Sequence, residues 1–105
     1  MDSEIPTLEL QFVRDLWLGT LDTPFGIIEL VVSGTPEAPN PAKLAALEAF
    51  LPTAVATIDR LRRKLSFRFL WHPIRLAVNN QNRVGVQFRN RLTGAQDQFL
   101  FADDA

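Results

Sequence analysis

Side chains that commonly carry out catalysis are few in this sequence of 105 residues, which has no cysteine and one histidine, His72. A nucleophile needs a base, and a group that orients the base, within hydrogen-bonding reach. The three serines stand outside any Gly-x-Ser-x-Gly turn, at Ser3, Ser33 and Ser66. His72 precedes Pro73, where a capping or partly buried structural histidine is the simpler interpretation and a ligand or base the alternative. We therefore predict that the protein is not an enzyme.

Metal ions and cofactors also lack the residues that usually hold them. Zinc takes three or four nitrogen or sulfur ligands, which one histidine without thiols does not supply. The five glycines stand apart, so the sequence has no phosphate-binding glycine loop. We expect Asp103 and Asp104 in a solvated chain end, and Glu29 and Asp22 on an exposed strand and turn. We predict no cofactor and no metal, with a ligand-binding domain or small hydrolase, using a pocket between helices and sheet, as the alternative function.

Charge is segregated along the chain, although the formal net charge is only −1. Residues 1–59 hold nine acidic and two basic side chains, a net charge of −7. Residues 60–96 hold no acid and nine bases, which are Arg60, Arg62, Arg63, Lys64, Arg68, Arg75, Arg83, Arg89 and Arg91. Arginine dominates this set, and its planar fork pairs with carboxylates and phosphates through two hydrogen bonds at once.

Two protein-based interpretations of this segregation stay open. Acidic and basic strands can pair within one sheet, so that their charges cancel internally. Alternatively, an acidic protein partner docks on the arginines, which are common anchors at interfaces. The binding residues that we select for this second interpretation are Arg75, Arg83, Arg89 and Arg91.

Nucleic acid is a third interpretation of the basic region 60–91. Phe67, Phe69 and Trp71 lie among the arginines and could stack on bases. However, these aromatic residues fall where a helix core is expected, and a pI near 5.7 is low for a nucleic-acid-binding domain. We therefore expect no nucleic-acid partner.

Trp17 is the last candidate binding residue. It alternates with Leu16 and Leu18, so it points to the opposite face of their strand. If Leu16 and Leu18 lie in the core, Trp17 is exposed on the outer sheet face and marks a partner surface or a homodimer seam. The alternative is a bulge that returns Trp17 to the core.

Periodicity predicts strands, then helices, then strands. Alternating or β-branched runs indicate strands at 8–13, 16–18, 27–32, 74–78, 84–88 and 98–101. Asn40 is a good helix N-cap and Pro41 suits the first helical position. Apolar spacing of three and four predicts helices near 41–51 and 53–69, kinked at Pro52 or separated there by a turn.

We therefore expect one α+β domain over residues 1–105, with loose termini at 1–7 and 102–105. Its layers are an antiparallel sheet of about five strands and a helical hairpin or kinked helix packed on one face. The N-terminus has no basic start or apolar run typical of a signal peptide, and no apolar stretch reaches the length of a bilayer span. The lack of cysteine fits a reducing compartment, so we expect a cytoplasmic protein without membrane contact.

The layout also resembles a family of small bacterial domains of unknown function, some of whose relatives are immunity proteins of toxin systems. The resemblance rests on the segment 33–37, which runs into Asn40-Pro41 and then into Leu44, Leu47 and Phe50. The acidic character of that family is missing here after residue 60. The resemblance implies the same α+β fold and points to protein binding, with no catalytic motif to transfer.

These observations predict a non-catalytic protein–protein interaction module. We expect it to bind through the outer sheet face and the arginines that edge this face. The expected partner is a protein with an acidic surface or a second copy of the chain, because open sheet edges pair readily.

Overall fold

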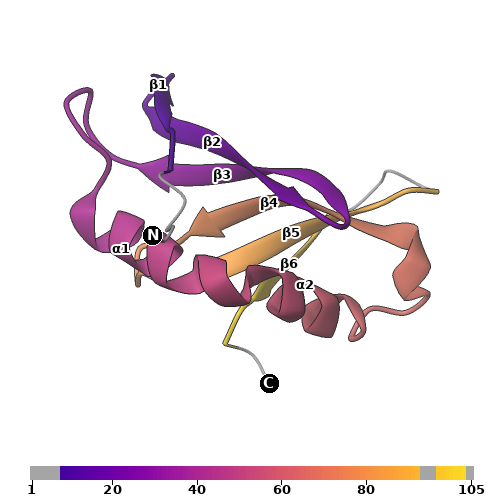
Figure 1. Cartoon of the computed structure of the whole chain (residues 1–105). Helices are drawn as coiled ribbons and strands as arrows, with labels where there is room; N and C mark the ends of the chain where they lie inside the picture. The colour runs from indigo at the N-terminus through magenta and orange to yellow at the C-terminus, as the bar shows by residue number, and fades with distance from the viewer. Residues whose placement is uncertain (1–7, 93–96, 104–105) are drawn as a thin grey trace, which may run out of the picture.

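The structure is a computed structural model that describes residues 8–92 and 97–103 and shows one six-stranded sheet with a long helical segment on one side (Figure 1). The strands lie side by side in chain order: β1 (Gln11–Val13), β2 (Leu16–Thr23), β3 (Gly26–Ser33), β4 (Trp71–Val78), β5 (Val84–Asn90) and β6 (Gln98–Phe101). The predicted α+β class is confirmed. The expected termini at 1–7 and 104–105 lie outside the described residues.

The sheet is mixed, so the prediction of an antiparallel sheet of about five strands is wrong. Every neighbouring pair is antiparallel except β3 and β4, which run parallel with Leu30 opposite Leu76. The reason is the long connection between these two strands. A helical crossover carries the chain back to the starting end of the sheet, so the next strand enters in the same direction.

A single long helical segment provides this crossover, in place of a hairpin. It consists of α1 (Pro41–Phe50), a 3₁₀ turn η1 (Leu51–Thr53) and α2 (Ala54–Arg62). The predicted start is confirmed, because the Asn40 side chain accepts hydrogen bonds from the amides of Ala42 (3.0 Å) and Lys43 (3.2 Å). Pro52 has no amide hydrogen for the helix ladder, and the chain tightens there without turning back.

The helical segment ends at Arg62, so the prediction of a helix to residue 69 is wrong. Phe67 adopts a left-handed conformation (φ 56°), which stops a right-handed helix. A second 3₁₀ turn, η2 (Arg68–Leu70), then leads into β4. Phe67 and Phe69 are therefore exposed on a loop, where the apolar spacing had placed Phe69 in the core.

The hydrophobic core lies between the helical segment and one face of the sheet. It is formed by the buried side chains of Ile28, Leu30, Val32, Leu47, Phe50, Ala54, Ile58, Leu61, Leu76, Val84, Val86 and Phe88. The opposite side, called the outer face below, has no helix over it among the described residues (Figure 1). The fold therefore has two layers and leaves one sheet face open.

The segment Pro41–Arg62 is long and apolar enough to cross a membrane by length and composition alone. Core helices pass the same test, and one side of this segment packs on the sheet through Leu47, Ile58 and Leu61. Its outward side carries exposed residues, including Glu48. The sheet therefore covers one side of the segment and leaves the other open.

Candidate functional site

The outer face carries a row of small and apolar residues across five strands. Because paired residues in neighbouring strands point to the same side, the register aligns these residues in one line. The row consists of Leu18, Val31, Ala77, Gly85 and Phe101. Further apolar side chains extend it, and this set of residues is called the apolar row below: the exposed Val13, Leu16 and Phe99.

Gly85 matters because the Phe99 ring covers it. A Cβ atom at position 85 would lie only 2.2 Å from the ring, so no larger residue fits without moving Phe99. Phe99 also packs edge-on against Phe101, with ring centroids 5.2 Å apart. The end of the apolar row at β6 is therefore an aromatic platform that remains partly open to solvent.

A chain of polar contacts, called the polar ladder below, runs beside the apolar row. Arg75 Nε donates to Glu29 Oε1 at 2.7 Å, and Arg75 also donates to the Gln87 side chain. Gln87 Nε2 donates to Asp97 Oδ2 at 2.7 Å, and Arg89 donates to the same carboxylate at 3.3 Å. The hydrogen bond from Arg89 holds the pKa of Asp97 below its usual value. The ladder balances two arginines with two carboxylates.

Arg83 is also paired within the chain. Its guanidinium makes two hydrogen bonds to Asp103, at 2.8 and 3.2 Å, which lower the pKa of that carboxyl group. It also lies 4.0 Å above the Phe101 ring. Asp103 is therefore tied to Arg83, while its side chain remains 65% exposed to solvent, as expected for a residue near the chain end.

The selected arginines divide into two groups. Arg75, Arg83 and Arg89 each pair with a carboxylate, as in the interpretation of internal cancellation. Arg91 instead contacts His72 (Nη2···Nδ1, 3.2 Å). The structure therefore brings Arg75 and Arg89 together on the outer face, where both were expected, but it supplies their acidic partners from the same chain.

Trp17 lies on the inner side of β2, opposite Val32, and not on the outer face. Its indole Nε1 donates to the Thr35 carbonyl (2.8 Å), and its ring packs against Phe12 with centroids 5.5 Å apart. No bulge is needed. Leu16 and Leu18 instead face outward, so the observed strand has the reverse orientation to one that places these two leucines in the core.

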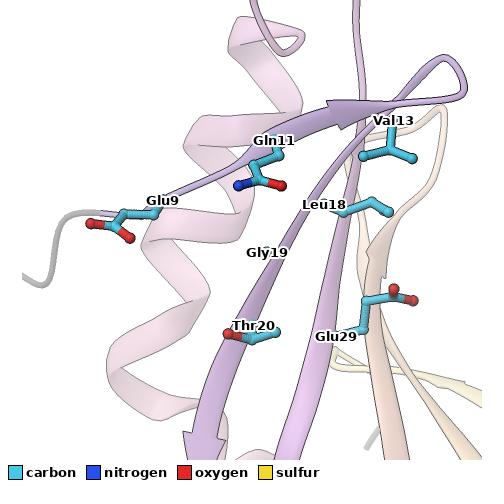
Figure 2. A pocket seen from close by; sticks show the side chains of 7 residues that line it. All are labelled: Glu9, Gln11, Val13, Leu18, Gly19, Thr20 and Glu29. Carbon is cyan, nitrogen blue, oxygen red and sulfur yellow. The ribbon is translucent and has the colours of Figure 1, made fainter.

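A shallow hollow of about 540 Å³ lies where β1 meets β2 on the outer face (Figure 2). Its lining residues are Glu9, Gln11, Val13, Leu18, Gly19, Thr20 and Glu29. The hollow has two carboxylates, and Glu29 is already paired with Arg75. Within residues 8–92 and 97–103, no group of three potential metal-ligating side chains occurs. The hollow is a shallow depression of mixed polar and apolar lining.

A second feature is called the basic corner below and consists of Arg62, His72 and Arg91. The sequence pointed to Arg91 as a binding residue and left a ligand role for His72 open, but it did not bring the two together with Arg62. These residues line one cavity of about 280 Å³ together with Phe25 and Trp71. Burial lowers the pKa of His72, and the charges of Arg91 and Arg62 lower it further. Each residue comes from a different segment, so only the charge-rich stretch 60–91 hinted at this cluster.

A bulge between Pro73 and Arg75 changes the neighbourhood of Ile74. Strict alternation along the strand predicted at 74–78 would put Ile74 on the same side as Leu76. The extra residue in β4 instead lets Ile74 line a hollow with His72 and Arg89. This hollow adjoins the basic corner and joins it to the outer face.

No protein-family model, curated protein or solved structure matches the chain.

Proposed function

We propose that this protein is a non-catalytic protein–protein interaction module that binds through the outer face of its sheet. The observation that supports this most is the apolar row, which no helix covers among the described residues. Contiguous apolar surface of this kind marks interaction sites in soluble proteins. The resemblance to immunity-type proteins favours the same class of function.

The partner that fits the outer face best is a second copy of the chain. A twofold interface places the same surface on both sides, so it must be complementary to itself. The polar ladder meets this condition because Arg75 and Arg89 are balanced by Glu29 and Asp97. Two such faces can stack as sheets do, with their apolar rows in contact.

An acidic partner would bind this face less favourably than a second copy of the chain. Arg75, Arg83 and Arg89 already hold carboxylates, and a partner's acid would have to displace them. The sheet edges are also a poorer site than the face, because β1 has three residues and β6 has four. Both considerations favour face-to-face self-association.

The test is a single charge placed in the apolar row. Leu16→Asp is suitable because the side chain is 38% exposed, so the change should spare the core. We expect the wild-type protein to form dimers in multi-angle light scattering as concentration rises. The variant should remain monomeric, because burying an unpaired carboxylate costs several kcal/mol.

Val55→Asp is the matched control, since Val55 is 40% exposed but lies on the helical segment. It should dimerise like the wild type. A wild-type protein that stays monomeric at every concentration would overturn the proposal of self-association. Equal behaviour of Leu16→Asp and Val55→Asp would overturn the assignment to the outer face.

A further inference from the structure

The basic corner gathers positive charge from three separate segments. Arg62 lies at the end of α2, His72 in β4, and Arg91 directly after β5. The loop that follows α2 is fixed beside them, because Arg62 Nε donates to the Arg68 carbonyl (3.1 Å) and Trp71 Nε1 donates to the Ser66 carbonyl (3.1 Å). The three side chains therefore meet at one cavity by the fold and not by sequence proximity.

This charge has no counter-charge within the part of the chain that the structure describes. The carboxylate ion pairs there involve other arginines, namely Arg63, Arg75, Arg83 and Arg89. Arg62 lies 5.3 Å above the Phe25 ring and contacts a neutral carbonyl, while Arg91 contacts a neutral imidazole. Such partners orient a guanidinium without cancelling its charge.

The hydrogen bond from Arg91 also determines which nitrogen of the His72 ring carries the hydrogen. A guanidinium only donates, so Nδ1 of His72 accepts and Nε2 carries the hydrogen of the neutral ring. The Cε1–Nε2 edge faces Gly26, where a Cβ atom would lie 3.6 Å from Cε1 and 3.8 Å from Nε2. Because Gly26 has no side chain, only its backbone lies against this edge of the ring.

We propose that the basic corner is a binding site for a phosphate monoester dianion, a role that does not depend on the self-association proposed above. A phosphate monoester carries a charge of about −1.5 to −2 near neutral pH and has three acceptor oxygens. Arg62 and Arg91 both line the cavity, and their two guanidinium forks match that charge. A single carboxylate would leave one arginine unmatched.

The exposed aromatic residues beside the corner offer a place for the organic part of the ligand. Phe67 and Phe69 are 69% and 64% exposed, and their rings meet edge to face at 6.3 Å. Phe67 and Phe69 flank Arg68 in the chain, and the Arg68 carbonyl accepts a hydrogen bond from Arg62. The site thus combines phosphate donors with apolar contact area.

His72 gives a direct readout, because it is the only histidine in the chain. The experiment follows its Cε1–H signal by NMR at pH 7 while inorganic phosphate, O-phosphoserine or adenosine 5′-monophosphate is added, with sodium chloride at equal ionic strength as the reference. We expect a saturable shift with the phosphates and none with chloride. The double variant Arg62→Gln/Arg91→Gln should weaken binding at least tenfold, because it removes two charge-assisted hydrogen-bond donors.

The control is Arg63→Gln, which removes one positive charge next to Arg62, at a position where Arg63 pairs with Asp59 on the helix surface. It should bind like the wild type. Equal affinity for all three compounds identifies phosphate alone as the ligand group. Tighter binding of the nucleotide that is lost in Phe67→Ser identifies the aromatic pair as its contact. No saturable shift with any phosphate, or equal losses in Arg63→Gln and the double variant, would overturn the proposal.

Discussion

At the scale of single residues, the arginines show why charge segregation in a sequence is a poor guide to free binding groups. The acidic first half and the basic second half meet within one sheet, so Glu29 of β3 faces Arg75 of β4. Their side chains are still more than a third exposed, and exposed ion pairs contribute about 0.2–1 kcal/mol. The ion pair therefore fixes the positions of the two side chains on the outer face and adds little to the free energy of unfolding.

This predicts a small coupling between Glu29 and Arg75. In a double-mutant cycle with Glu29→Gln and Arg75→Met, we expect a coupling free energy of about 0.5 kcal/mol, measured by urea unfolding. Arg63→Met with Asp59→Gln is a reference cycle for an exposed helical pair. A coupling of zero would show that the ion pair is absent in solution.

At the scale of elements, the long helical segment decides the topology. Asn40 and Pro41 determine where it starts. At Pro52 the chain forms a 3₁₀ turn and continues in the same direction, so the helices on either side of Pro52 form one crossover. This crossover makes β3 and β4 parallel and covers only one face of the sheet. The open outer face is thus a consequence of having a single helical layer.

Asn40→Ala should destabilise the protein, because the change leaves the amides of Ala42 and Lys43 without their acceptor. We expect a loss of about 1 kcal/mol in the free energy of unfolding, seen as a lower urea midpoint with an unchanged slope. Asn40→Asp keeps an acceptor and should cost much less. Equal losses for both variants would show that the cap is not the cause.

At the scale of the whole molecule, stability should depend on pH through its one histidine. Burial and the charges of Arg91 and Arg62 lower the pKa of His72 below 6.5, so the unfolded chain binds the proton more tightly than the folded one. The contribution of neutral His72 to the free energy of unfolding is therefore fully present above pH 6.5. It is lost as the pH falls from 6.5 through the pKa of His72 in the folded protein.

We therefore expect the urea midpoint to fall between pH 7.5 and 5.5 in the wild type and to change much less in His72→Gln. Asp97 and Asp103 also have lowered pKa values, but their stability is lost only as pH falls below 3.8, in a separate window. An identical decline in both proteins above pH 5.5 would contradict the assignment to His72.

The local parts of the fold are determined by the sequence itself. The helix start at Asn40-Pro41, the strand at Ile27–Val32 and the alternation in β5 follow from capping, β-branching and period, which act between near neighbours. The central place of β3 between β2 and β4 also agrees with its apolar run. These features need no knowledge of distant residues.

The tertiary structure decided which groups meet. Period alone gives the alternation of Leu16, Trp17 and Leu18, but both sides of that strand are apolar, so only packing shows that Trp17 points inward. Likewise, the partners of Arg75 and the meeting of Arg62 with His72 depend on pairing across the sheet. Charge and hydrophobicity act through space, and the sequence lists the groups without stating their distances.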